Sequence, residues 1–310
     1  MSSRRQFLKG TAAALAAGAT GLTGCFIAPR AAKEKTMPKH SFRISLAAWS
    51  LHLAIQGPEQ LRMLDVPQML REEFAIDGLE FVNTLLEVPT AHYVDTLRKR
   101  CGEFKITPVL IMCDGEGSLA HPEQAERERA VRNHHKWIDI ASDLGCRTIR
   151  VNWHGSVDDD FKDERAIGAM IDRSAETFAK LVALGRRDNV DVIIENHGGP
   201  SSNPDLLVRL MKAVDSPHLG TLPDFGNFPA EVDRYRAVDA MMPYAKAVSA
   251  KCYDFDPSGN ETKIDFERML KIVVDRHGYH GWIGIEYEGE RLSERDGIRA
   301  ARDLLIRLRG

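Results

Sequence analysis

The sequence lacks the features of a nucleic-acid-binding protein and of a cysteine-based site. Its 42 basic and 45 acidic side chains give a formal net charge of −3, so no positive excess favours a phosphate backbone as partner. The 5 cysteines show no CxxC spacing, which argues against a cysteine-ligated zinc site. No GxGxxG motif follows the first predicted strand, which argues against a doubly wound dinucleotide-binding sheet.

The N-terminus has the composition of an export signal. A pair of arginines at positions 4 and 5 begins a basic segment of the twin-arginine type, and a weakly apolar stretch over 12–22 follows it. Leu22–Cys25 matches a bacterial lipobox, in which the cysteine becomes lipidated. We expect a signal peptide over 1–24, a tether over 25–41, and a periplasmic lipoprotein attached to the membrane only through Cys25. The other cysteines are expected to be core thiols without disulfides.

The rest of the chain, 42–310, alternates short β-rich apolar runs with amphipathic stretches. The predicted strands are Phe42–Trp49, Ile76–Val82, Ile106–Met112, Arg147–Trp153, Val190–Asn196, Leu219–Asp224, Ala245–Cys252 and Trp282–Tyr287. The predicted helices are Pro58–Phe74, His92–Phe104, Pro122–Leu144, Glu164–Asp188, Pro204–Val214, Glu231–Met241, Asp265–His277 and Ser293–Arg309. Apolar strands that alternate with helices indicate a covered parallel sheet, and eight such pairs predict a single α/β domain, a (β/α)₈ TIM barrel.

Carboxylates recur near the ends of these strands, where such barrels carry their active sites. They are Glu80, Glu195, Asp224 and Glu286. A carboxylate that ends an apolar strand is costly to bury without a cation or hydrogen bonds, and several together repel one another. A divalent metal held by Glu195, Asp224 and Glu286 is the simplest remedy, and oxygen ligands suit Mg²⁺ or Mn²⁺ better than zinc.

Lys251 ends the predicted strand between those of Asp224 and Glu286, and it allows three interpretations. It lies beside a metal and binds a substrate oxygen, it is an acid or base with a lowered pKa, or its ammonium replaces the metal. Lys251 is therefore a candidate catalytic residue.

Further polar and aromatic side chains at the strand ends could contact a sugar. Asn152 and the histidines are suited to hydrogen bonds with hydroxyl groups, and a tryptophan, Trp49 or Trp153, offers an apolar wall. The candidate substrate-binding residues are Trp49, Glu80, Asn152, His154, His197 and Glu288.

Five short motifs follow one another at these barrel positions: Ala47–His52, Gly78–Phe81, Ile194–His197, Pro223–Asn227 and Gly284–Gly289. Their order resembles the xylose isomerase-like TIM-barrel superfamily, over about residues 42–308. This superfamily contains the sugar phosphate isomerases and epimerases, ketose 3-epimerases and a more distant AP endonuclease branch.

The resemblance implies a metal site with one ligand from each of the last four strands. Its Glu, Asp, His and Glu ligands fall on Glu195, Asp224, Ser249 and Glu286, so a serine stands where the family has its histidine. His197 could supply a nitrogen instead. Asn227 is a second departure, since several epimerases have a histidine there. The resemblance also implies that Glu195 and Glu286 move protons, one on each face of the substrate.

These observations favour a sugar isomerase or epimerase that acts outside the cytoplasm on a small carbohydrate, with metal-assisted proton transfer next to a carbonyl. Two alternatives stay open: a lyase that cleaves 3-keto-glycosides at the same site, and a catalytically silent sugar-binding lipoprotein. A DNA-repair endonuclease is disfavoured, because few of the 11 histidines lie at strand ends and the chain carries an export signal. An oligomer is compatible with the sequence.

Overall fold

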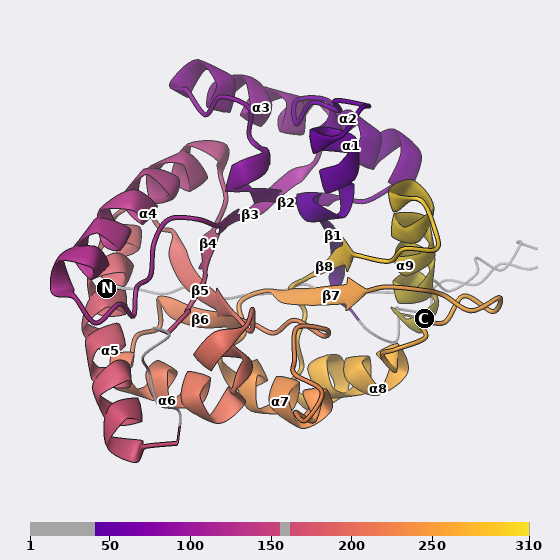
Figure 1. Cartoon of the computed structure of the whole chain (residues 1–310). Coiled ribbons are helices and arrows are strands. Elements are labelled where there is room, and N and C mark those ends of the chain that lie inside the picture. Colours follow the sequence, from indigo (N-terminus) through magenta and orange to yellow (C-terminus); the bar gives the residue numbers. More distant parts are fainter. Residues whose placement is uncertain (1–40, 156–161, 310) are drawn as a thin grey trace, which may run out of the picture. The chain divides into compact units, whose positions relative to one another are not determined.

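Eight parallel strands form the inner ring of the computed structural model, and helices surround them (Figure 1). The structure describes residues 41–155 and 162–309, so the predicted signal peptide, the lipobox with Cys25 and nearly all of the predicted tether lie outside the described residues. The sheet has the strand order β6-β5-β4-β3-β2-β1-β8-β7. Isolated parallel bridges from Thr221 to Ala245 and from Asp224 to Ser249 join β6 to β7. The predicted TIM barrel is confirmed.

The strands are short and, with few exceptions, buried along their length. They are β1 (Arg43–Ala47), β2 (Gly78–Val82), β3 (Thr107–Cys113), β4 (Thr148–Val151), β5 (Asp191–Glu195), β6 (Leu219–Leu222), β7 (Val248–Cys252) and β8 (Trp282–Tyr287). The predicted sixth and seventh strands are longer than the structure has them. β6 ends before Pro223, which cannot donate a backbone hydrogen bond to the ladder.

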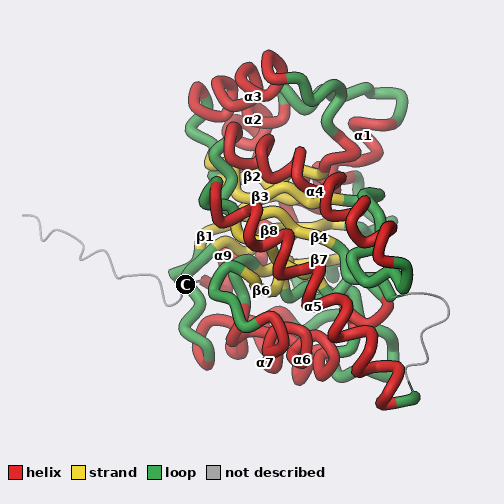
Figure 2. Tube along the Cα trace, turned by 90° about the vertical axis from the view of Figure 1, so that its left-hand side faces the viewer, coloured by secondary structure: helices red, strands yellow, loops and turns green. Residues whose placement is uncertain are grey.

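The helices cover the outside of the sheet, as the side view shows (Figure 2). They are α1 (His52–Gln56), α2 (Val66–Met69), α3 (Ala91–Glu103), α4 (Gln124–Leu144), α5 (Glu164–Arg187), α6 (Pro204–Val214), α7 (Arg234–Met241), α8 (Phe266–Leu270) and α9 (Glu294–Arg309). Short 3₁₀ turns η1 (Ala48–Leu51), η3 (Asn83–Leu85), η4 (Gly199–Ser202) and η5 (Met242–Tyr244) and π-helical turns η2 (Leu70–Phe74) and η6 (Lys271–Arg276) complete the elements.

Two helix predictions need correction. The predicted helix Pro58–Phe74 is wrong in its first half, because 57–65 form a loop and the helical part begins with α2. Pro67 explains this start, since proline lacks a backbone donor and is tolerated only in a helix's first turn. The predicted helix Asp265–His277 is α8 followed by the π-helical turn η6.

The helices pack on the barrel through apolar stripes at helical spacing. In α5 the buried residues recur every three or four positions from Ile167 to Gly185. Gly185 is required where it lies, because a Cβ there would meet the carbonyl oxygen of Val190 at 2.3 Å. The four cysteines of the described residues are buried and free. Within the described residues, no helix combines the length and apolar character that a membrane span needs.

Candidate active site

Three carboxylates converge at the carboxyl end of the barrel. Glu195 is the last residue of β5, Asp224 follows β6 by two positions, and Glu286 lies next to the end of β8. One oxygen of each lies within 4.8 Å of the others, and all three side chains are buried. Since residues on separate strands supply them, only closure of the barrel brings these oxygens together.

A hydroxyl group connects two of the three carboxylates. Ser249, from β7, places its Oγ 2.6 Å from Asp224 Oδ2 and 3.1 Å from Glu286 Oε2. Ser249 thus lies inside the carboxylate cluster.

The loop after β6 fixes the Asp224 carboxylate. Its Oδ1 accepts hydrogen bonds from the backbone N–H groups of Gly226 and Asn227, at 2.8 and 2.7 Å. Its own backbone N–H donates to Asn196 Oδ1 at 2.7 Å. Burial raises the pKa of Asp224, against the lowering effect of the Lys251 ammonium. A further positive charge near the Asp224 carboxylate would therefore be favourable.

Glu195 lies against a buried guanidinium. Arg150 from β4 has its Nε 2.9 Å from Glu195 Oε2, and Asn227 Nδ2 donates to Glu195 Oε1 at 2.9 Å. Arg150 Nε and Glu195 Oε2 are close enough for an ion pair but have no hydrogen-bond partner. Burial raises the pKa of Glu195, and Arg150 offsets only part of that rise.

Lys251 is the second buried cation of the site. Its Nζ donates to Glu286 Oε1 at 2.9 Å and also lies 3.0 Å from Glu288 Oε1. Burial acts to raise the pKa of Glu286, but Lys251, with smaller effects of Arg150 and Ser249, lowers the pKa below its ordinary value and so favours the ionised form. Burial acts to lower the pKa of Lys251, yet the surrounding carboxylates raise it well above its usual value. This direction is opposite to the lowered pKa that the interpretation of Lys251 as an acid or base requires.

Glu80 lies deeper in the barrel than the sequence predicts. β2 continues for two residues beyond it, and its side chain is fully buried between Ser45 and Gly284. Ser45 Oγ donates to Glu80 Oε1 at 2.6 Å, while Oε2 has no partner. Gly284 is essential for this arrangement, because a Cβ there would meet Glu80 Oε1 at 2.3 Å. Burial raises the pKa of Glu80 to about 8.

The aromatic candidates differ in exposure. Trp49 is half-buried and stacks on His52 with ring centroids 4.6 Å apart. Trp153 is fully buried and donates from Nε1 to Ser174 Oγ at 3.0 Å, so it is a core residue and cannot form the wall of a sugar site.

The polar candidates lie on the loops after β4, β5 and β8. Asn152 donates to Asp114 Oδ1 at 2.7 Å and accepts from Arg150 at 3.0 Å. His154 and His197 are exposed, with ring centroids 6.3 Å apart. Partial burial and the nearby Arg150 lower the pKa of both rings, which favours their neutral forms. Glu288 is half-buried and reaches the site through Lys251.

Sequence reasoning missed Arg150 and Asp114. Arg150 lies within an apolar strand rather than after it, and its NH1 donates to Asp114 Oδ1 at 2.6 Å. A signal was available, because the strand period of two places Thr148, Arg150 and Asn152 on one face. A charged residue on the inward face of a barrel strand indicates a polar interior.

The chemistry of the donors fits a hard divalent cation. The cluster offers carboxylate oxygens, and no histidine or cysteine of the described residues completes a group of ligands with them. Glu195 Oε2 is a buried oxygen without a hydrogen-bond partner. The buried cations Arg150 and Lys251 neutralise part of the negative charge of the three carboxylates. A divalent cation bound by these carboxylates could neutralise the rest.

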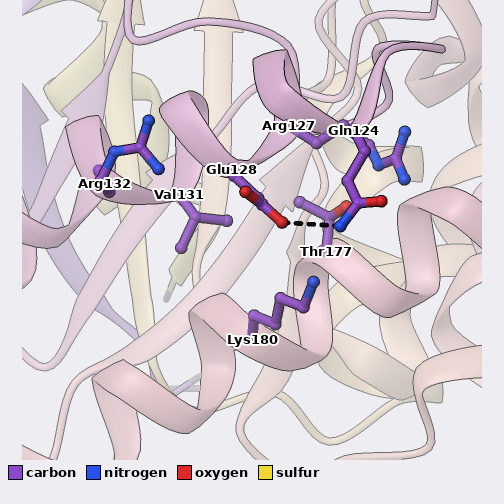
Figure 3. A pocket seen from close by; sticks show the side chains of 7 residues that line it. All are labelled: Gln124, Arg127, Glu128, Val131, Arg132, Thr177 and Lys180. Carbon is purple, nitrogen blue, oxygen red and sulfur yellow. Dashed lines mark hydrogen bonds between the residues drawn. The ribbon is translucent and has the colours of Figure 1, made fainter.

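Surface cavities lie away from this cluster. One, of about 300 Å³, is formed by side chains of α4 and α5, including Arg127, Arg132 and Lys180 (Figure 3). It contains none of the predicted site residues.

Comparisons with known proteins agree with this architecture. The sequence profile described as Xylose isomerase-like TIM barrel matches residues 72–308, and that of the twin-arginine translocation signal matches residues 1–21. No curated protein sequence matches the chain.

Solved structures with the same fold include the following three. An L-ribulose 3-epimerase has a TM-score of 0.70 at 16% identity, covering 85% of this chain and 93% of its own. A D-psicose 3-epimerase with D-tagatose, from Clostridium cellulolyticum H10, has a TM-score of 0.65 at 14% identity, covering 85% and 98%. A xylose isomerase-like TIM barrel protein from Mycobacterium smegmatis, in complex with magnesium, has a TM-score of 0.61 at 17% identity, covering 87% and 97%.

Proposed function

Because the chain belongs to the xylose isomerase-like TIM barrel family, we propose that it is a sugar isomerase or epimerase that moves a proton at the carbon next to a carbonyl group. The convergence of Glu195, Asp224 and Glu286 at one end of the barrel carries this proposal. The epimerases and the magnesium complex among the neighbours support it.

We assign Glu195, Asp224 and Glu286 as ligands of one Mg²⁺ or Mn²⁺ ion. The ion supplies a Lewis acid that polarises the substrate carbonyl and stabilises negative charge on its oxygen. Glu195 at the end of β5, Asp224 on the loop after β6 and Glu286 on β8 would hold it.

Glu195 and Glu286 are the groups that take and return the proton. They come from strands on different sides of the cluster, so each can face one side of a bound sugar. Lys251 keeps Glu286 ionised through their 2.9 Å hydrogen bond, which a proton acceptor requires. Arg150 lies beside Glu195 in the same way that Lys251 lies beside Glu286. Lys251 thus acts mainly by positioning the Glu286 carboxylate and keeping it ionised.

The rim of the barrel binds the sugar. Trp49 supplies an apolar surface for one face of a ring, and Asn152, His154, His197 and Glu288 supply polar groups around it. Glu80, which is fully buried, supports the site from below. This mixture of one aromatic and several neutral or acidic groups suits an uncharged carbohydrate.

We place the reaction outside the cytoplasm. The twin-arginine signal over residues 1–21 supports export of the folded protein. The lipobox sequence Leu22–Cys25 supports a periplasmic lipoprotein anchored through Cys25.

Solvent-exchange measurements test the proposal. The purified protein with Mn²⁺ or Mg²⁺ is incubated in D₂O with a panel of ketoses and keto-sugars, and deuterium at the carbon next to the carbonyl is followed by NMR. Glu195→Gln and Glu286→Gln should each abolish incorporation, while Glu290→Gln, an exposed change on the loop after β8, should not. Equal incorporation in wild type and both site variants would refute the proton-transfer roles.

The same panel distinguishes the lyase. Proton abstraction next to the carbonyl of a 3-keto-glycoside leads to loss of the substituent one carbon further on, so a lyase releases the free leaving alcohol. An isomerase or epimerase keeps all the carbons of its substrate in one product.

A sugar-binding protein without turnover is the second candidate. The observation that favours it is the presence of Arg150 and Lys251, which already neutralise two of the three carboxylates. Titration calorimetry with sugars, run with and without Mn²⁺, distinguishes the isomerase or epimerase from the sugar-binding protein. Sugar binding that needs no metal and gives no deuterium exchange would select the silent protein.

A further inference from the structure

We propose that Ser249 Oγ is a fourth oxygen ligand of the cation held by Glu195, Asp224 and Glu286, and that this hydroxyl makes the site prefer Mg²⁺ and Mn²⁺ to Zn²⁺. The inference deepens the proposed function, because it rests on the metal site assigned there. It concerns the ligand set and the choice of metal.

The position of the hydroxyl oxygen matches that of a ligand. Ser249 Oγ lies 2.6 Å from Asp224 Oδ2 and 3.1 Å from Glu286 Oε2. Neighbouring oxygens around an octahedral Mg²⁺ ion with bonds of about 2.1 Å are about 3 Å apart. The two distances lie on either side of that spacing, so Ser249 Oγ can share an octahedral ion with either carboxylate oxygen after only small movements.

The single hydrogen of the Ser249 hydroxyl supports a role for its oxygen as a lone-pair donor. Serine carries one hydroxyl hydrogen and two lone pairs. It can donate to only one of Asp224 and Glu286 at a time, although it lies within hydrogen-bond distance of both. Its oxygen therefore faces the other carboxylate with lone pairs, as two ligands of one cation do.

Each carboxylate of the cluster has one oxygen that accepts hydrogen bonds from groups other than Ser249, and a second oxygen that we assign to the ion. Asp224 Oδ1 accepts two backbone N–H groups, Glu286 Oε1 accepts from Lys251, and Glu195 Oε1 accepts from Asn227. The remaining oxygens are Asp224 Oδ2, Glu286 Oε2 and Glu195 Oε2. Ser249 contacts the first two, and the third lies 2.9 Å from Arg150 Nε. One oxygen from each of four residues, with water in the remaining positions, is a set that suits a small hard ion.

Soft or nitrogen donors are absent from this set among the described residues. The nearest thiol by sequence, Cys252, lies against the backbone oxygen of Glu286 at 3.8 Å, and burial raises its pKa well above the usual value. His197 is exposed on the loop after β5. Zinc gains most from imidazole and thiolate ligands, so an all-oxygen set removes its usual advantage.

The first test removes the hydroxyl. Ser249→Ala is titrated with Mn²⁺, and free Mn²⁺ is measured by electron paramagnetic resonance. Loss of a ligand should weaken Mn²⁺ binding at least about tenfold, whereas Ser249→Thr, which keeps the hydroxyl, should bind close to wild type. Circular dichroism and thermal unfolding confirm that each variant is folded.

The second test changes the ligand chemistry. Ser249→Cys should give a thiolate-to-cadmium charge-transfer band in the ultraviolet on addition of Cd²⁺. Wild type and Ser142→Cys, an exposed change on α4, serve as controls for the native cysteines and for a lone surface thiol. Ser249→His should bind Zn²⁺ at least about tenfold more tightly than wild type does and should lose the preference for Mn²⁺.

The outcomes separate this inference from the proposed function. Unchanged Mn²⁺ affinity in Ser249→Ala overturns the inference, and so does a Ser249→Cys spectrum equal to those of the controls. A wild-type protein that binds neither Mn²⁺ nor Mg²⁺ overturns it as well. Normal Mn²⁺ binding with no deuterium exchange into any sugar refutes the isomerase and leaves the ligand assignment standing.

Discussion

Arg150 Nε lies 2.9 Å from Glu195 Oε2, with 4% of the Arg150 side chain and 1% of the Glu195 side chain exposed. The same guanidinium donates to Asp114 Oδ1 at 2.6 Å. Charges taken out of water this completely are tolerated only in pairs, because an unpaired buried ion costs several kcal/mol. Arg150 therefore links the carboxylate cluster to the polar residues at the end of β3.

Replacement of Arg150 by methionine should leave two carboxylates without their cation. We expect Arg150→Met to lower the free energy of unfolding by about 3 to 5 kcal/mol, measured by urea denaturation. The double variant Arg150→Met/Glu195→Gln removes the unpaired charge and should recover part of that loss. Equal stability of the single and double variants would show that the 2.9 Å contact does not contribute as an ion pair.

Glu80 should make stability depend on pH. Its pKa rises from an ordinary 4.5 to about 8 in the folded protein, so the folded state keeps a proton that the unfolded state has lost. The resulting stabilisation is complete below about pH 4.5 and falls by about 1.4 kcal/mol per pH unit until about pH 8. Glu80→Gln imitates the neutral carboxyl and removes this dependence.

Wild type and Glu80→Gln should therefore diverge as the pH rises. From pH 5 to pH 7 we expect wild type to lose about 2 to 3 kcal/mol relative to the variant, measured by urea unfolding at fixed salt. Glu290→Gln, an exposed change, should run parallel to wild type. Parallel curves for Glu80→Gln and wild type would mean that Glu80 is ionised in the folded protein.

Lys251 should matter for turnover more than an ordinary lysine. Lys251→Met removes the cation that keeps Glu286 ionised, and we expect deuterium incorporation to fall at least about 100-fold. Lys251→Arg keeps the charge and should retain more activity. Lys271→Met, which breaks an exposed pair with Glu267, is the matched control and should be neutral. Wild-type exchange in Lys251→Met would exclude a role for this ammonium.

The fold and the carboxylate cluster could be predicted because both depend on local sequence pattern. Eight apolar strands alternate with amphipathic helices, and parallel strands bring all their carboxyl ends to one end of the barrel. Residues that end a strand or follow it within two positions, such as Glu195 and Asp224, are therefore brought to the same end of the barrel.

The remaining features depend on depth and on contacts across the barrel. Glu80 resembles a strand-end residue in sequence, but β2 continues to Val82, so its carboxyl lies below the cluster rather than at its mouth. The bridging position of Ser249 depends on the relative heights of β6, β7 and β8. The alternation of apolar and polar residues predicts which face of a strand a side chain occupies, but not its height along the barrel axis.

Glu294, near the C-terminal end of the chain, accepts hydrogen bonds from the segment 48–56 that follows β1. This residue begins α9, and its two carboxylate oxygens accept the backbone N–H groups of Leu53 and Ala54 at 2.7 and 2.9 Å. Ser50 adds a second connection, since its hydroxyl accepts the backbone N–H of Tyr287 at 2.9 Å. Trp49, the proposed apolar wall for the sugar, lies on this segment.

Glu294→Ala should release that segment without touching the carboxylate cluster. We expect a loss of about 1 to 2 kcal/mol in unfolding free energy, as for a lost helix cap, and faster amide hydrogen exchange over 48–56. If Trp49 contacts the sugar, KM should rise while kcat changes little, because the proton-transfer groups keep their positions. Glu290→Ala, an exposed change on the loop before α9, provides the control. Unchanged KM together with faster exchange would show that the segment moves independently of sugar binding, and would remove Trp49 from the binding site.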